Sequence, residues 1–119
     1  MIKKNHFAKS VEERKEEIEN ISQKYPDKVF IYLEKDINCK NIDEIDKHKY
    51  LCPKDMLFNQ FIYVIRKRLK ISDKQSIIFF INNIIPNPNS SMQELYYRYK
   101  NIDKFLHIKY TSENFFGSF

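Results

Sequence analysis

The chain has 119 residues, a formal net charge of +5 and 15% aromatic residues, all of them Phe or Tyr. This length fits one domain that buries roughly two thirds of its unfolded surface, and the aromatic content argues against a disordered chain. Residues 1–6 lack the apolar run of a signal peptide, and no stretch reaches the roughly 20 apolar residues of a membrane span. We therefore expect a soluble cytoplasmic protein that reaches a membrane only if something attaches it.

The residue types that most often carry chemistry are few and scattered. Cys39 and Cys52 lack CxxC spacing, so we expect reduced thiols rather than a disulfide or a metal site. His6, His48 and His107 lie on different predicted elements, and no Ser/His/Asp or Cys/His pairing is supported. The sequence therefore predicts no catalytic residues, no metal and no cofactor, and an enzyme is the least supported class.

The first half of the chain begins with a helix and a strand. Ser10 and Glu13 have the spacing of a capping box, which predicts a helix over residues 11–24. The β-branched and aromatic run 29–33 is typical of a strand. The Asp- and Asn-rich residues 36–46 are predicted to form a loop.

A second short strand and the strongest helix follow. Residues 48–52 favour a strand that Pro53 ends, and residues 56–69 favour a helix. The apolar residues of this helix share one face: Phe58, Phe61, Ile62, Ile65 and Leu69. Residues 76–81 are apolar almost throughout, which predicts a central strand covered on both faces.

The last elements complete a recognisable order. Ser91 and Glu94 predict another capped helix, and residues 105–110 alternate as a strand. The order α, β, β, α, β, α, β predicts an α+β, ubiquitin-like β-grasp fold, a four-stranded mixed sheet with two core-side helices and an N-terminal helical extension. We expect an extension over 1–26, a ubiquitin-like domain over 27–111 and a flexible tail over 112–119. The predicted core is Val29, Ile31, Leu33, Phe58, Ile62, Ile65, Phe79, Ile81 and Leu106.

Positive charge is concentrated in one segment. Residues 47–70 contain seven Lys or Arg residues against Asp55 alone, while the remaining residues are close to neutral. Such a patch suits an acidic peptide, anionic lipid or nucleic acid. Because the neighbouring aromatic side chains are needed for the core, the pattern does not favour nucleic acid.

Blocks of sequence in nearly every element carry a family resemblance. They cover residues 24–29, 46–51, 60–68, 78–83, 92, 94–96, 105–108, 110 and 113–117. Together they resemble the autophagy ubiquitin-like modifiers, the group that contains GABARAP. The resemblance implies a monomeric modifier that a cysteine protease cuts after its tail glycine and that activating and conjugating enzymes attach to phosphatidylethanolamine. The glycine is Gly117, the only one in the chain, and cleavage before Ser118 releases Ser118-Phe119. The modified protein is then expected on autophagosomal or other cytoplasmic membranes.

The resemblance also implies a groove for acidic peptides of the form aromatic-x-x-aliphatic, which add a strand beside the second strand of the sheet. The positions matching the aromatic pocket are Glu17, Ile21, Phe30, Tyr32, Lys49, Leu51 and Phe105. Those matching the aliphatic pocket are Tyr50, Cys52, Pro53, Met56, Phe61 and Val64, with Lys47 and Arg68 facing the acids.

The sequence departs from the family pattern in that groove. Phe30 stands where the family usually has proline, which is expected to narrow the aromatic pocket, and Cys52 replaces an aliphatic residue. The loop over 36–45 is one residue longer. Two alternatives stay open, a nonconjugated adapter that only binds peptides, and a small RNA- or lipid-binding protein built on the basic segment.

Overall fold

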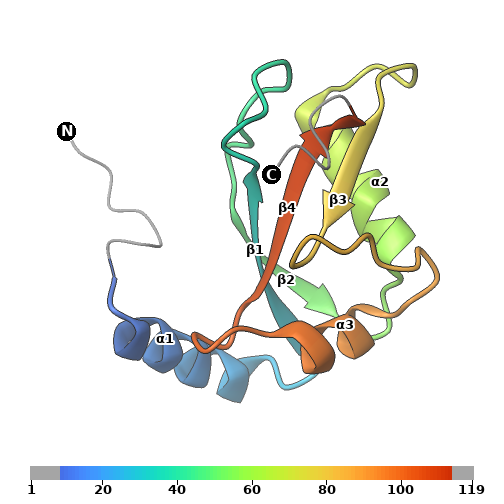
Figure 1. Ribbon diagram of the computed structural model, residues 1–119. Coiled ribbons are helices and arrows are strands. Elements are labelled where there is room, and N and C mark those ends of the chain that lie inside the picture. Colours follow the sequence, from blue (N-terminus) through green and yellow to red (C-terminus); the bar gives the residue numbers. More distant parts are fainter. Residues whose placement is uncertain (1–8, 114–119) are drawn as a thin grey trace.

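The computed structural model describes residues 9–113 and has the predicted order of elements. Helix α1 spans Val11–Lys24, strand β1 Lys28–Lys35, strand β2 Lys49–Pro53 and helix α2 Phe58–Leu69. Strand β3 spans Ile77–Phe80, helix α3 Met92–Tyr99 and strand β4 Leu106–Ser112. The described strands form one sheet in the order β2-β1-β4-β3, in which β1 and β4 run parallel and the other pairs antiparallel (Figure 1). This is the four-stranded mixed sheet expected of a ubiquitin-like fold.

Local signals in the sequence account for the ends of the helices. The Ser10 hydroxyl accepts from the Glu13 amide, and the Glu13 carboxylate accepts from the Ser10 amide, so the predicted capping box is confirmed. The Ser91 hydroxyl accepts from the Glu94 amide at the start of α3. Helix α2 ends at Leu69, and the residue that follows it, Lys70, has a left-handed φ of 56°, a conformation usually supplied by glycine.

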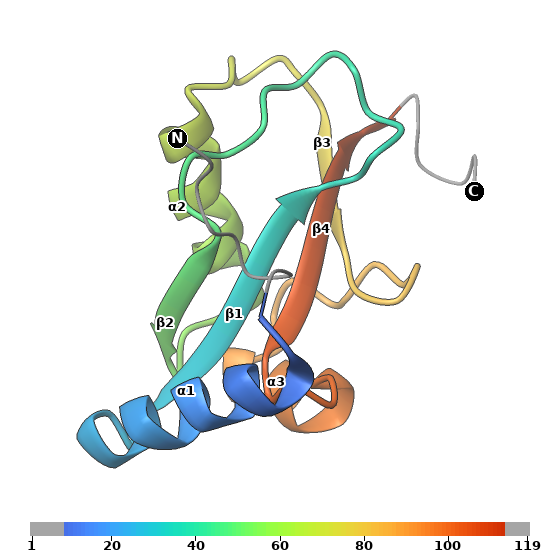
Figure 2. The same cartoon turned by 90° about the vertical axis from the view of Figure 1, so that its left-hand side faces the viewer.

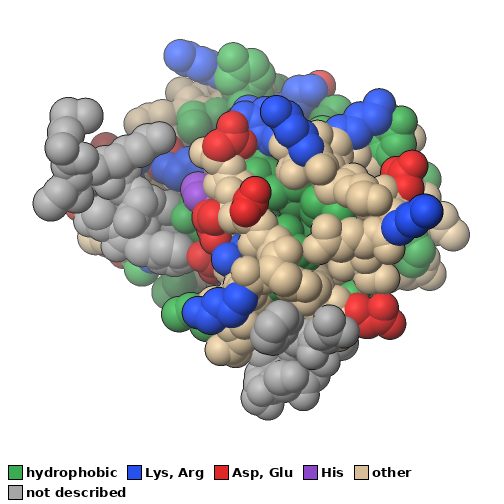
Figure 3. All heavy atoms as spheres, turned by 90° about the horizontal axis from the view of Figure 1, so that it is seen from above, with side chains coloured by type: hydrophobic (Ala, Val, Ile, Leu, Met, Phe, Trp, Pro, Cys, Tyr) green, Lys and Arg blue, Asp and Glu red, His purple; other side chains and the backbone are tan. Residues whose placement is uncertain are grey.

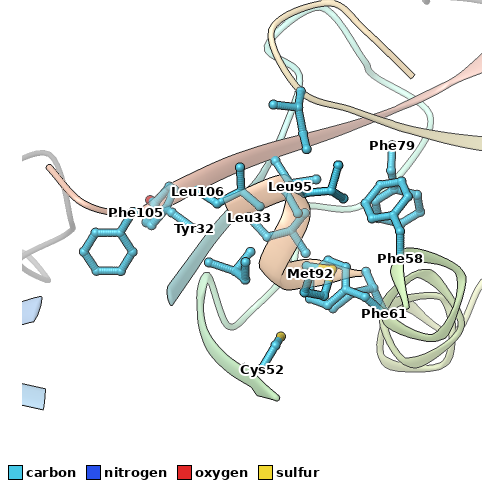
Figure 4. Packing of buried hydrophobic residues seen from close by; sticks show 14 of the residues in the cluster. Tyr32, Leu33, Cys52, Phe58, Phe61, Phe79, Met92, Leu95, Phe105 and Leu106 are labelled. Carbon is cyan, nitrogen blue, oxygen red and sulfur yellow. The ribbon is translucent and has the colours of Figure 1, made fainter. Parts of the chain in front are cut away.

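The core lies between the sheet and helices α2 and α3. Phe58 of α2 lies toward Phe79 of β3 and Phe61 of α2 lies beside Met92 of α3, while Leu33 and Leu106 cover the middle of the sheet (Figure 4). Of the nine predicted core residues, all but Ile62 are buried, and Ile62 is half-buried against the core. Helix α1 lies on the other side of the sheet from α2 (Figure 2). On that side, the Glu17 carboxylate of α1 lies 2.8 Å from the Lys49 ammonium of β2.

The prediction that residues 76–81 form a central strand is wrong. β3 pairs only with β4 among the described strands and therefore lies at an edge of the sheet. Its apolar character still has a cause, because Phe79 faces the core and Phe80 is buried on the opposite face of the strand. The central strands are β1 and β4.

The boundary expected between domain and tail is also wrong at Ser112. β4 continues through Thr111 and Ser112, which pair with β3 and are both buried. Thr111 and Ser112 are both polar, so the alternation of apolar and polar residues that predicts a strand stops at Tyr110. The backbone pairing with β3 nevertheless continues through Ser112. The rest of the expected tail, from residue 114 on, lies outside the described residues.

The predicted loop between β1 and β2 packs more tightly than its polar composition indicated. Cys39, Ile42 and Ile45 are buried against the sheet. The hydroxyl of Tyr110 donates to the Asp43 carbonyl at 2.7 Å and accepts from the Ile45 amide at 2.8 Å. One side chain of β4 therefore holds the loop in place.

Candidate functional site

The open edge of β2 is the first feature of the candidate site. Among the described strands, β2 pairs only with β1, with Leu51 opposite Phe30 and Lys49 opposite Tyr32. The other edge of β2 can therefore accept the backbone of an added strand. Alternation along β2 sends successive side chains to opposite faces of the sheet. A peptide on this edge thus meets two separate surfaces, one on the α1 side and one on the α2 side.

On the α1 side, a small cavity of about 80 Å³ lies between α1, β1, β2 and the start of β4. We call it the aromatic slot. Its lining contains six of the seven residues predicted for the aromatic pocket, together with Tyr50, which was predicted for the other pocket. The lining residues are Glu17, Ile21, Phe30, Lys49, Tyr50, Leu51 and Phe105.

Phe30 forms part of the aromatic slot and is almost fully buried. Its ring packs edge-on against Tyr96 of α3, with the ring centroids 6.4 Å apart. A buried ring here leaves less room for an incoming aromatic side chain than a smaller residue would. Tyr32 lies on the same face of β1 but is absent from the slot lining, and the rings of His48 and His107 lie against it at 5.5 Å.

An ion pair spans the aromatic slot. The Lys49 ammonium lies 2.8 Å and 3.0 Å from the two carboxylate oxygens of Glu17, and Lys9 approaches one of them at 3.3 Å. Partial burial opposes ionisation of Glu17, but hydrogen bonds and charge from Lys49, and then Lys9, lower its pKa below the usual value. The Lys49 ammonium also lies 5.8 Å from the centre of the Phe105 ring. A ligand acid must therefore compete with Glu17 for Lys49.

On the α2 side, the residues predicted for the aliphatic pocket are a mixture of core and surface. The Tyr50 ring packs edge-on against Phe61 at 5.8 Å, and Phe61 and Cys52 are buried. Burial raises the pKa of the Cys52 thiol to about 12, so the sulfur behaves as a neutral apolar group. Val64 is exposed, whereas Pro53 and Met56 are half-buried. An aliphatic anchor here would lie on the exposed part of this surface.

Lys47 and Arg68, the two cations predicted to face the peptide acids, have different neighbours. The Lys47 ammonium lies over the Tyr50 ring at 5.1 Å. Arg68 already binds Asp46 in a two-pronged pair, with Nε–Oδ1 at 2.9 Å and Nη2–Oδ2 at 3.2 Å. The sequence gave no sign of this pair, because the partners are 22 residues apart. Arg68 can therefore bind a peptide acid only if it binds that acid and Asp46 together, or if its pair with Asp46 breaks.

The predicted tail positions lie outside the residues that the structure describes, and the described residues show neither a cluster of metal ligands nor a membrane-spanning helix. Gly117 and Ser118, the predicted conjugation and cleavage positions, lie outside the described residues. Within residues 9–113, no group of three His, Cys, Asp or Glu side chains is placed to hold a metal ion. In the same range, none of the helices combines the length and the apolar character needed to cross a bilayer.

Comparisons with known proteins show which family the chain is similar to. The family model described as "Autophagy protein Atg8 ubiquitin like" matches residues 13–117. "Autophagy-related protein 8" of Schizosaccharomyces pombe is 44% identical over 92% of this chain and 89% of its own length. The protein of the same name from Mycosarcoma maydis is 43% identical over 91% of each chain. The crystal structure of Trypanosoma brucei ATG8 superposes with a TM-score of 0.84 at 29% identity, covering 95% of this chain and 97% of that one. The chain therefore belongs to the Atg8 family of ubiquitin-like autophagy proteins, which are modifiers and not enzymes.

Proposed function

We propose that this protein is conjugated through Gly117 to phosphatidylethanolamine. A cysteine protease hydrolyses the bond between Gly117 and Ser118. The activating enzyme then uses ATP to adenylate the freed glycine carboxylate, which releases pyrophosphate, and a cysteine thiol displaces AMP to form the thioester that passes to the conjugating enzyme. The lipid amine then attacks the thioester carbonyl, an amide forms and the enzyme thiol leaves. The observation that carries the proposal is that the family match ends at residue 117, on the only glycine of the chain.

Glycine suits both steps for the same physical reason. It has no Cβ, so its backbone can approach a surface closely and its carbonyl stays open to a nucleophile. An alanine adds a methyl group next to the reacting carbonyl. We therefore expect Gly117→Ala to block cleavage or conjugation.

The conjugation proposal is tested with purified enzymes, ATP and liposomes that contain phosphatidylethanolamine. The substrates are the wild type, Gly117→Ala and a chain that ends at Gly117. Wild type should require the protease, the shortened chain should bypass it, and Gly117→Ala should gain no lipid. A wild-type chain that stays uncut would favour the alternative, an adapter that is never conjugated. Lipidation of Gly117→Ala at the wild-type rate would contradict the role given to this glycine.

We also propose that the edge of β2 binds acidic aromatic-x-x-aliphatic peptides in partner proteins. The open strand edge supports backbone pairing, and the aromatic slot supports an aromatic anchor on the α1 side. The aliphatic anchor then lies near Val64 and Met56, and peptide acids lie near Lys47 and Lys49. Because Lys49 is paired with Glu17 in the free protein, its pairing with a peptide acid adds little net affinity.

Calorimetry with such a peptide tests the groove. Micromolar affinity, worth about 8 kcal/mol, is expected, and alanine at the aromatic anchor should cost about 2 kcal/mol or more. Leu51→Ala removes an exposed side chain of the slot and should weaken binding. Ile102→Ala removes an exposed side chain outside the slot lining and should leave affinity unchanged. Equal affinity of the two variants would contradict the placement of the groove.

The Atg8 family is associated with autophagosomes, and its members interact with the conjugation enzymes and with motif-bearing partners. For this chain we propose a cytoplasmic form before conjugation and a membrane-bound form on autophagosomes or related vesicles after it. The proposed form in both places is a monomer, and neither a cofactor nor nucleic acid is part of this function.

A further inference from the structure

We infer that the turn after β1 contacts the membrane bilayer once the protein is attached to lipid, with Ile37 as the contacting side chain. This inference rests on the proposed conjugation at Gly117. Ile37 is 82% exposed, the largest exposed fraction among the exposed large hydrophobic residues of the described chain. A single exposed isoleucine is common on protein surfaces, so its position matters more than its exposure.

Ile37 lies beside the point where β4 ends. The Asp36 amide donates to the carbonyl of Tyr110 at 2.8 Å, and the Cys39 amide donates back to the Asp36 carbonyl at 3.0 Å. Residues 36–39 thus form a tight turn whose base is bonded to β4 and whose tip carries Ile37. In Figures 1 and 2 this turn, the end of β4 and the loop before β3 lie at the same end of the molecule.

The length of the tail brings that end close to the lipid. Gly117 follows Ser112 by five residues, and five extended residues span at most about 18 Å. The attached lipid headgroup therefore stays within that distance of the end of β4. The opposite end of β4 lies about 20 Å away, because the strand has seven residues. The end that carries Ile37 is thus the one held near the bilayer.

The charges around Ile37 are compatible with a lipid surface. Lys40 follows in the same loop, and Lys74 lies in the neighbouring loop before β3, which is joined to the first by a 3.4 Å hydrogen bond from Gln75 to the Asn41 carbonyl. Long basic side chains can reach phosphate groups while an apolar neighbour enters the headgroup region. The same loops also carry exposed acids, and Figure 3, which looks onto this end, shows basic and acidic side chains interspersed. We therefore expect the apolar side chain rather than net charge to govern the contact.

The chain contains no tryptophan, so one introduced Trp gives an unambiguous fluorescence probe. We compare Ile37→Trp with Ile102→Trp, because Ile102 is also highly exposed, at 71%, but lies in the turn before β4 at the other end of the strand. Each variant is made with a histidine tag in place of Ser118-Phe119 and bound to phosphatidylcholine vesicles that contain nickel-chelating lipid. This attachment bypasses the protease and conjugating enzymes, so the result is independent of whether the proposed conjugation occurs.

On vesicle binding, Ile37→Trp should shift its emission to shorter wavelength and be quenched by brominated phosphatidylcholine. Both effects should persist when salt is raised and vanish when imidazole releases the tag. Ile102→Trp should show neither effect. An unshifted, unquenched Ile37→Trp on vesicles that cosediment with the protein would overturn the inference. So would a shift of Ile102→Trp as large as that of Ile37→Trp.

Discussion

Replacing Tyr110 by phenylalanine removes a single buried oxygen atom that makes two hydrogen bonds. The hydroxyl donates to the Asp43 carbonyl at 2.7 Å and accepts from the Ile45 amide at 2.8 Å, and both the Tyr110 and Ile45 side chains are buried. Phenylalanine keeps the ring and its packing against Phe79, whose centroid lies 6.0 Å away. The variant therefore isolates the loss of the two bonds.

The expected loss of unfolding free energy follows from the Ile45 amide and the Asp43 carbonyl, which Tyr110→Phe leaves without their partner. A buried donor or acceptor without a partner costs about 1–3 kcal/mol, and water can reach part of this loop, so about 2 kcal/mol in total is expected. For a chain of this length, that loss lowers the melting temperature by roughly 8 °C. Because the loss falls in the loop between β1 and β2, hydrogen exchange of that loop should rise more than exchange of α2.

Urea unfolding followed by circular dichroism measures the change in unfolding free energy. Tyr97→Phe is the matched control, because Tyr97 is 55% exposed and its side chain therefore lies largely in water. The control should change stability by less than about 0.5 kcal/mol. If Tyr110→Phe and Tyr97→Phe unfold at the same urea concentration, the Tyr110 hydroxyl does not hold the loop.

Three further predictions concern the ion pair, the backbone and the aromatic slot. Because the pKa of Glu17 is lowered in the folded protein, its pair with Lys49 adds stability above the unfolded pKa and loses it as pH falls through the folded pKa. Glu17→Gln should thus lower stability by under about 1 kcal/mol at pH 7, with no difference from wild type in strong acid, as measured by urea titrations at both pH values. Lys104 has a φ of 71°, so Lys104→Gly should raise the unfolding free energy by about 1 kcal/mol, whereas Lys100→Gly, at a φ of −57°, should not. Phe30→Leu enlarges the slot and should improve calorimetric affinity for a Trp-anchored peptide more than for a Phe-anchored one, and an unchanged ratio would contradict the idea that Phe30 limits the anchor.

Local patterns predicted the elements because each pattern reports on one helix or strand. The i, i+3, i+4, i+7 spacing along α2 identified its buried face, and the capping residues located the start of α1. The order of strands across the sheet is not a local property. The apolar residues Phe79 and Phe80 showed that both faces of β3 are covered, but covered faces do not determine whether a strand has a neighbour on each side. For this reason the edge position of β3 could not be inferred from its composition.

The candidate site shows the same division between local and distant information. Its slot residues were placed by family resemblance, and six of the seven do line the cavity. The partners of its cations were missed, because Glu17 is 32 residues from Lys49 and Asp46 is 22 residues from Arg68. The charge count of residues 47–70 predicted a basic patch, but it did not include Glu17 and Asp46, which lie outside that segment and pair with its cations. The free charge offered to a peptide is therefore smaller than the sequence implied.

The intact mass of the protein recovered from its own cells tests the conjugation at Gly117 most directly. The proposal predicts two species, one that has lost Ser118 and Phe119, and one that has also gained a phosphatidylethanolamine. Gly117→Ala expressed in the same cells should yield no lipid-bearing species. Recovery of the wild type only at its full-length mass, under conditions that induce autophagy, would contradict the proposal.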